Sequence, residues 1–248
     1  ATGDDDDSGD DDDSGDDDDS GDDDDSGDDD DSACADADGD GFAAVACGGT
    51  DCDDAAADTH PGATEVCDGD LEDCTSGLID AGASCDAGCT LQHDAGKAYL
   101  LCDGYQTTAS GTWDFAEGHC QGLAATGPGY DLVVIETEEE RDALLGFAAS
   151  TAPGVSEWWL GLIDQCGPCS GQVACGEGIW IFTPQCTPAT YTETGGGTAL
   201  PWHPTVGQYT TSENCAVLMT SGQYLGQFDD IVCGTGTLSH ICESQNTP

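Results

Sequence analysis

Apolar residues are spread very unevenly along this chain, and their pattern divides it into three parts. Residues 3–32 contain no apolar side chain, residues 33–84 contain isolated ones among cysteines and aspartates, and regular patterns begin near residue 85. In the last part, the run Tyr-Leu-Leu-Cys at 99–102 predicts a strand. We therefore predict an acidic tail at 1–32, a cysteine-rich module at 33–84 and a folded domain at 85–248.

Apolar spacing and capping residues predict two helices in the domain. Trp113, Ala116, Cys120 and Leu123 recur at three- and four-residue intervals behind Thr112, which stands at an N-cap position. The sequence 137–140 reads as a capping box before a second helix, whose apolar stripe lies at 144, 145, 147 and 148 and which ends at 153–154. Buried strands are predicted at 132–135 and 158–162, so the fold class is α+β.

The charge balance limits the partners of this chain. It has two basic residues, Lys97 and Arg141, against 52 acidic ones, for a formal net charge of −50. Self-repulsion of this size opposes a compact state unless counterions are present. Nucleic acid and anionic membrane surfaces are therefore poor partners, whereas divalent cations and basic surfaces are favoured. Adaptation of the surface to high salt is another contributing cause of the charge.

The cysteine content indicates the compartment. Sixteen cysteines, an even number, predict a disulfide framework in an oxidising environment. No apolar run approaches the ~20 residues of a membrane-spanning helix. Because the chain begins with Ala1 and not Met, we interpret it as a mature secreted or cell-surface product whose signal peptide has been removed.

The tail consists of five successive copies of Gly-Asp-Asp-Asp-Asp-Ser between Gly3 and Ser32. Such a segment has nothing to bury, so charge repulsion should extend it when it is free. A solubilising polyanion is one interpretation. The regular spacing favours two others, carboxylates that bind calcium and a serine in each copy that carries a sugar. The candidate glycosylation sites are Ser8, Ser14, Ser20, Ser26 and Ser32.

The module opens with acidic side chains at alternate positions before Gly41, which is the first half of a calcium-binding loop. A complete EF-hand is not expected, because Cys47 occupies the position of its last acidic ligand. The module resembles the Asp/Cys-rich repeats of bacterial surface proteins, which implies an irregular structure stiffened by calcium and disulfides. An ordinary acidic loop region is the alternative, and copper or zinc binding through His60 is a weaker one, because a lone histidine is usually not a ligand. The candidate calcium ligands are Asp36, Asp38, Asp40, Asp51, Asp53 and Asp54.

The domain resembles C-type lectin-like domains over residues 89–243. The order and spacing of its landmarks carry the resemblance, which implies two helices flanking a small antiparallel sheet with a long loop region above it. The landmarks are Trp113, Ala116, Cys120, Leu132–Ile135, Glu140, Leu144, Trp159-Leu160-Gly161-Leu162, Trp180, Trp202, Glu213-Asn214-Cys215, Cys233 and Ile241-Cys242-Glu243.

The same resemblance implies three disulfides and a calcium corner. The disulfides are Cys120–Cys242, Cys215–Cys233 and Cys89–Cys102. The calcium ligands would be Glu213, before a cysteine, and Asp229 and Asp230, which stand where the family has Trp-Asn-Asp.

The sugar-reading tripeptide of the family, Glu-Pro-Asn or Gln-Pro-Asp, is missing, and the nearest candidate is His203-Pro204-Thr205. The corner therefore has three interpretations: a calcium site, a glycan site, or a structural corner without an ion.

Cysteines at 166, 169, 175 and 186 lie in a predicted loop insertion. Cys166 and Cys169 have the spacing of a redox pair, but no βαβ unit surrounds them. A four-thiolate zinc site is a second interpretation. We favour loop disulfides, because the compartment is expected to be oxidising.

No Gly-x-Ser-x-Gly elbow, phosphate-binding loop or His-Glu-x-x-His helix occurs in the sequence, so we expect no enzyme. The predicted function is that of a secreted, calcium-dependent structural and adhesive protein, the self-assembling subunit of an extracellular filament or surface layer. A glycan-binding C-type lectin is the main alternative, and a small enzyme on the same fold is a third.

Overall fold

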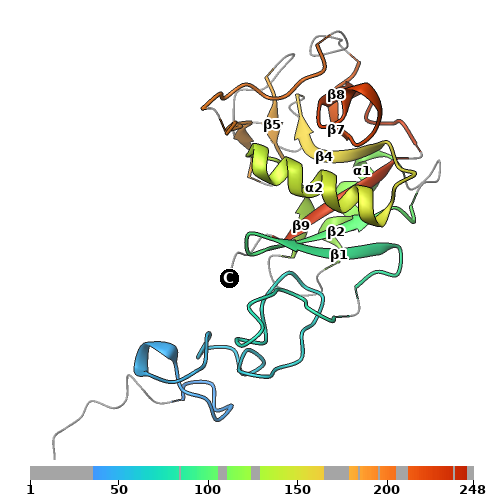
Figure 1. The fold of residues 1–248 in the computed structure, drawn as a ribbon. Coiled ribbons are helices and arrows are strands. Elements are labelled where there is room, and N and C mark those ends of the chain that lie inside the picture. Colours follow the sequence, from blue (N-terminus) through green and yellow to red (C-terminus); the bar gives the residue numbers. More distant parts are fainter. Residues whose placement is uncertain are drawn as a thin grey trace, which may run out of the picture.

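The computed structural model describes residues 36–83, 85–105, 111–123, 129–164, 179–183, 185–194, 196–204, 212–236 and 238–244. Its regular structure is concentrated after residue 88, above an irregular module (Figure 1). The helices are α1 (Trp113–Gln121), α2 (Glu138–Thr151) and the 3-10 turns η2 (Val45–Cys47) and η3 (Gly222–Tyr224). The strands are β1 (Cys89–Asp94), β2 (Lys97–Cys102), β3 (Tyr130–Leu132), β4 (Glu157–Ile163), β5 (Ile181–Phe182), β6 (Thr187–Pro188), β7 (Cys215–Met219), β8 (Phe228–Ile231) and β9 (Ser239–Ser244).

The sheet is assembled around β9. This strand pairs antiparallel with β2 and β3 and parallel with β4, through Trp158 opposite Ser239 and Trp159 opposite His240. β4 also pairs with β5 and β7, and β7 carries β8. The α+β fold class and the two flanking helices are confirmed, and the sheet is mixed because β4 and β9 run in the same direction.

The two helices cover opposite faces of the sheet, and two adjacent tryptophans show the division. Successive strand residues point to opposite faces, so Trp158 packs with the cluster that contains Leu144 of α2, and Trp159 packs with the cluster that contains Ala116 of α1. Both tryptophans are fully buried. Gly161 of β4 is required by close approach, because a Cβ there would lie 2.6 Å from the carbonyl oxygen of Leu132.

Both helices begin where the capping residues predict. The Thr112 side chain accepts a hydrogen bond from the N–H of Phe115, and the Thr137 side chain accepts one from the N–H of Glu140. The reciprocal bond of the expected capping box is displaced by one residue, since the Glu140 carboxylate accepts from the N–H of Glu136. The Glu140 side chain is therefore turned back toward the sheet.

One strand boundary was predicted wrongly. The expected strand 132–135 is β3 at Tyr130–Leu132, and the buried residues 133–135 continue outside the ladder. Val133 donates its N–H to Ile241 of β9 and accepts at its carbonyl from Gly161 of β4. Val133 thus lies between β9 and β4 and bonds to both, and the residues after it no longer pair with β9.

All three disulfides that the resemblance implied are present. Cys89–Cys102 joins directly opposed residues of the β1–β2 hairpin, and Cys215–Cys233 closes the end of the β7–β8 hairpin. Cys120–Cys242 ties α1 to β9 across a sequence separation of 122 residues, which the chain-entropy estimate values at roughly 4–5 kcal/mol. In the module, the described bridges are Cys52–Cys74 and Cys67–Cys85.

The end of the module is joined to the domain by packing and by hydrogen bonds. Ile79 is 1% exposed and packs in the same cluster as α1. Next to it, the completely buried Asp80 accepts hydrogen bonds from the Tyr130 hydroxyl and the Gly69 N–H. Burial raises the pKa of Asp80 to about 6. These contacts and the Cys67–Cys85 disulfide therefore connect the module with the domain across the expected boundary at 84/85.

We predict that Asp80 makes folding pH-dependent. Its pKa is raised above the unfolded value of 3.8, so its contribution to stability is full below about pH 4 and is lost as the pH rises to about 6. From pH 4 to 6.5 the wild type should lose up to about 3 kcal/mol more unfolding free energy than Asp80→Asn. Urea denaturation in a chelator at several pH values measures this. Asp103→Asn, at an exposed position, is the control. Equal slopes of unfolding free energy against pH for the wild type and Asp80→Asn would contradict the prediction.

Candidate calcium sites and the buried lysine network

The β7–β8 hairpin carries the candidate calcium corner. β8 alternates between buried and partly exposed residues, with Phe228 in the core, Asp230 3% exposed and Asp229 partly exposed. Glu213 precedes β7, and Cys215–Cys233 fixes the open end of the hairpin. Both aspartates lie within electrostatic reach of Glu213, so the structure brings the three predicted residues into one region.

Asp164 joins this corner and was not predicted from the sequence. It directly follows β4, is 2% exposed, and its N–H donates to the carbonyl of Asn214, the neighbour of Glu213. Burial raises the pKa of Asp230 to about 6, and the charges of Asp229, Glu213 and Asp164 add to the effect. Four carboxylates therefore share one poorly hydrated region. The signal that marks Asp164 is its place at the end of a strand that pairs with β7.

His203 occupies the edge of the corner where the sugar-reading tripeptide was sought. The backbone N–H of His203 donates to the carbonyl of Phe228, which places His203 beside Asp229. The His203 ring packs against the Tyr224 ring at a centroid distance of 3.7 Å. The side chain is 4% exposed. Pro204 is described, whereas Thr205 lies outside the described residues. A buried imidazole here replaces the acidic or amide oxygen that the family pattern requires.

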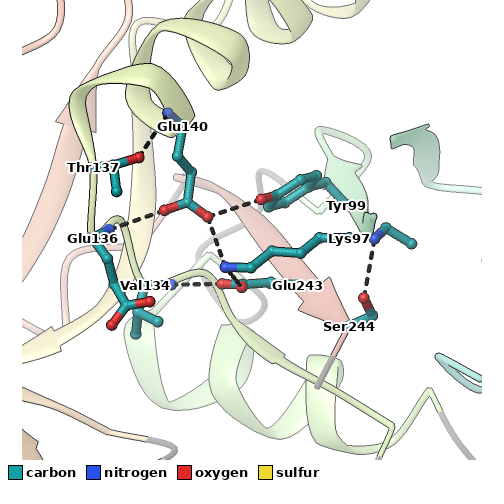
Figure 2. Close-up of polar contacts among 9 residues, drawn as sticks. Lys97, Tyr99, Val134, Glu136, Thr137, Glu140, Glu243 and Ser244 are labelled. Atoms are coloured by element: carbon teal, nitrogen blue, oxygen red, sulfur yellow. Dashed lines mark hydrogen bonds and ion pairs between the residues drawn. The ribbon is translucent and has the colours of Figure 1, made fainter. Parts of the chain in front are cut away.

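The two basic side chains of the chain are both engaged elsewhere. Lys97 forms ion pairs with Glu140 and Glu243, the first with an Nζ–Oε1 distance of 3.0 Å (Figure 2). Arg141 pairs with Glu138 and Asp142 on the surface of α2. No lysine or arginine is therefore left to compensate the carboxylates of the corner.

The lysine network links β2, α2 and β9. Glu140 accepts from Lys97 and from the Tyr99 hydroxyl, and Glu243 accepts from the N–H of Val134 (Figure 2). Burial raises the pKa of Glu243 to about 7, although Lys97 lowers it. Burial also opposes the charge on Lys97, but the two glutamates outweigh it and raise the pKa of Lys97 above its usual value.

The loop that carries the first three candidate calcium ligands brings their side chains together. Carboxylate oxygens of Asp36, Asp38 and Asp40 lie within 4.8 Å of one another. Asp36 accepts from the N–H groups of Gly39 and Gly41, which folds the loop around it. Gly41 has a φ of +99°, a conformation that L side chains rarely adopt.

The remaining candidate ligands of the module lie at different distances from this loop. Asp51 is 1% exposed and its charge reaches Asp38, while Asp54 accepts from the N–H of Ala37. Asp53 is exposed and accepts from the N–H of Ala55 instead. Within the described residues, Oδ2 of Asp38, Asp40 and Asp51 is buried without a hydrogen-bond partner. These oxygens are available to a cation.

Several predicted features fall outside the described residues. They are the five tail serines Ser8, Ser14, Ser20, Ser26 and Ser32, and the insertion cysteines Cys166, Cys169 and Cys175. Cys186 is described and is in a disulfide, as is Cys47. In the described part of the chain, no helix is long and apolar enough to cross a membrane.

Comparison with known proteins finds likenesses at the level of structure. No protein-family model and no curated protein matches the sequence. Among solved structures, the C-type lectin CEL-I of Cucumaria echinata has a TM-score of 0.45 at 16% identity, covering 64% of this chain and 96% of that one. Human lithostathine has a TM-score of 0.46 at 18% identity, covering 66% and 92%.

The carbohydrate-recognition domain of cow CD23, crystallised with an oligosaccharide, has a TM-score of 0.42 at 22% identity, covering 66% of this chain and 98% of that one. Residues 89–244 have a C-type lectin-like fold. The evidence within the chain is the two helices on opposite faces of the sheet and the three bridges in their expected positions. At these identities the likeness concerns the fold alone.

We predict that Lys97→Met destabilises the lectin-like domain by about 3–5 kcal/mol at neutral pH, because it leaves two buried carboxylates without a counter-charge. The loss should shrink at pH 5, because burial raises the pKa of Glu243 to about 7 and its carboxyl group is then largely protonated. Arg141→Met is the matched control, since its surface pairs contribute about 1 kcal/mol or less. Equal losses in urea denaturation for the two variants would show that the Lys97 network is not a buried constraint.

Proposed function

We propose that this chain is an extracellular, calcium-dependent binding protein without catalytic activity. The lectin-like domain is its interaction domain, and the cysteine-rich module is a support stiffened by disulfides and calcium. One observation carries the proposal: Asp164 and Asp230, 2% and 3% exposed, lie in the corner with Glu213 and Asp229 while both Lys/Arg side chains are engaged elsewhere. Buried carboxylates require a counter-charge or a proton.

Calcium fits the donor set of the corner better than other common ions. The donors are carboxylate oxygens, and calcium accepts six to eight oxygens in flexible geometry, with waters completing its shell. Within the described residues, Oδ1 of Asp229 is buried without a hydrogen-bond partner. The same chemistry applies to the Asp36–Asp40 loop, where three carboxylates are held together by their own backbone.

The disulfides support an extracellular location. The described bridges include two in the module and three in the lectin-like domain. Bridges of this density form and persist in oxidising compartments.

A glycan ligand is the second candidate, and the acidic corner favours it. Glu213, Asp229 and Asp230 keep the calcium-facing part of the pattern through which lectins of this fold hold sugar hydroxyls. His203 in place of an oxygen-bearing residue weakens sugar selection. Glycan-array binding that disappears in EDTA and in Asp230→Asn would establish the lectin function, and absence of binding in calcium would reject it.

A filament is the third element of the proposal, and the repeated tail sequence is its support. A subunit that binds its neighbour head to tail without closure generates a filament. Electron microscopy of the native secreted material should show filaments in calcium and their loss in a chelator. Monodisperse particles in calcium would reject self-assembly, and this result would not bear on whether the two candidate sites bind calcium.

We predict that the effect of Asp230→Asn on stability has opposite signs in EDTA and in saturating calcium. In EDTA the variant should be as stable as the wild type or more so, because it removes a buried charge repelled by its neighbours. In saturating calcium it should melt lower, since an ion present at about a hundred times its dissociation constant adds about 2.7 kcal/mol to the wild type.

Asp142→Asn, on the exposed surface of α2, is the matched control and should show no reversal. Differential scanning calorimetry with and without EDTA measures both variants. A wild-type melting temperature that EDTA does not change would contradict structural calcium in either site.

A further inference from the structure

The only lysine of the chain contacts two carboxyl groups that are nearly buried. Lys97 begins β2, Glu140 lies in the first turn of α2, and Glu243 lies on β9 (Figure 2). Nζ of Lys97 lies 3.0 Å from Oε1 of Glu140 and also contacts Oε1 of Glu243. The side chains of Glu140 and Glu243 are 10% and 6% exposed. One amine and two carboxyl groups are therefore held together, largely shielded from bulk water.

The carboxyl group of Glu243 is suited to act as an electrophile. Burial raises its pKa to about 7, although Lys97 lowers it, so the neutral acid is present near neutral pH. The backbone N–H of Val134 donates to Oε2 of Glu243 at 3.1 Å. A donor in this position stabilises the negative charge that develops on a carboxyl oxygen when a nucleophile adds to the carbon.

The carboxylate of Glu140 is placed to transfer protons. Its Oε1 accepts from Nζ of Lys97 and from the Tyr99 hydroxyl, and its Oε2 accepts from the N–H of Glu136 (Figure 2). A general base must lie within hydrogen-bond reach of the proton that it takes. Glu140 meets this requirement toward Lys97, and its other two bonds hold the side chain in place.

We propose that Lys97 and Glu243 form an intramolecular isopeptide bond between Nζ and Cδ, with Glu140 as the residue that transfers protons. Lys97 first passes one proton to Glu243, which gives an amine and a neutral carboxylic acid. The amine adds to Cδ, and Glu140 then takes a second proton from the nitrogen and delivers it to the departing hydroxyl. One water molecule leaves, and the reaction consumes no oxidant, reductant or activated group.

The surroundings of the three groups favour this reaction. Before it, three charged groups are held together in a poorly hydrated site, and after it only Glu140 keeps a charge, so two desolvated charges are removed. A cavity of about 270 Å³ lined by Lys97, Thr137 and Glu140 adjoins the amine and gives the departing water a way out.

The amine is the minor form of Lys97. Burial opposes its charge, but the two glutamates outweigh burial and raise its pKa. A bond that forms once in the life of each molecule needs only a rare reactive state. Reactants held in contact also react as if at effective concentrations of roughly 10⁵–10⁸ M.

The bond fixes the last strand of the lectin-like domain to its first hairpin. β2 and β9 are already paired through their backbones, with Tyr99 opposite Glu243. Thiols open disulfides by exchange at sulfur, whereas an amide is not open to this attack. The domain therefore keeps one covalent connection when Cys89–Cys102 and Cys120–Cys242 are reduced. The inference does not depend on calcium or on the function proposed above.

The test uses the full chain, folded and purified, then denatured, reduced and alkylated. A lysine-specific endoproteinase cuts a chain with free Lys97 into residues 1–97 and 98–248, whereas a bonded lysine is not a substrate. The wild type should stay uncut. Tandem mass spectrometry of a peptic digest should find a peptide with Lys97 joined to one with Glu243, lighter than their sum by one water. Complete cutting, or a joint to another residue, would overturn the proposal.

Glu140→Gln removes the proton-transferring group and keeps the size of the side chain. Lys97 should be cut completely in this variant, because the bond does not form. Glu138→Gln, in the same turn of α2, is the matched control and should stay uncut. Circular dichroism before denaturation verifies folding, and Glu140→Asp, which withdraws the carboxylate, replaces Glu140→Gln if that variant is unfolded. A folded variant at 140 that stays uncut would refute the role of Glu140.

Discussion

Compensation of negative charge is the constraint on which this structure depends. With two lysine and arginine side chains against 52 acidic ones, ion pairs are almost unavailable as a stabilising device. Lys97 lies where three elements, β2, α2 and β9, meet, and it forms ion pairs with Glu140 and Glu243 there. Loss of this lysine should lower the free energy of unfolding strongly, because two nearly buried carboxylates depend on its single ammonium group.

Elsewhere the chain stabilises its carboxylates with backbone N–H groups. Asp36 accepts from the backbone N–H groups of two glycines of its loop, which lower its pKa. Asp80 is the exception, because burial raises its pKa even though Gly69 and the Tyr130 hydroxyl donate to it. Such bonds use donors that turns leave unpaired in any case, so they require no cationic side chain. The corner around Asp230 instead gathers four carboxylates, and burial together with their mutual repulsion raises the pKa of Asp230, which makes this corner the strongest candidate for a cation.

Local features of the sequence predicted the helices well, and resemblance predicted the bridges. Thr112 and Thr137 cap α1 and α2 because capping depends on residues within one turn. The opposed tryptophans of β4 follow from strand alternation alone. The pairing of Cys120 with Cys242 could not be obtained from spacing, and came from the order of landmarks shared with C-type lectin-like domains.

The features that the sequence analysis missed are long-range. Asp164 reaches the corner only because β4 pairs with β7, and Glu243 reaches Lys97 only because β9 pairs with β2. The parallel pairing of β4 with β9 and the turn of Glu140 toward Lys97 likewise depend on tertiary packing. A chain position carries no signal for such contacts unless the topology is already known.

The interlocked bridges of the module set how the chain carries mechanical load. Cys52–Cys74 and Cys67–Cys85 overlap in sequence, so tension applied before Cys52 passes through the first bridge, back along residues 67–74, and through the second bridge. That path is about 25 Å of extended backbone plus Cα–Cα spans of 5.7 and 5.2 Å. Unbridged, the same segment would extend to about 110 Å. Residues 52–85 can thus extend to only about a third of their unbridged length, so tension applied at Cys52 reaches the lectin-like domain with limited extension of this segment.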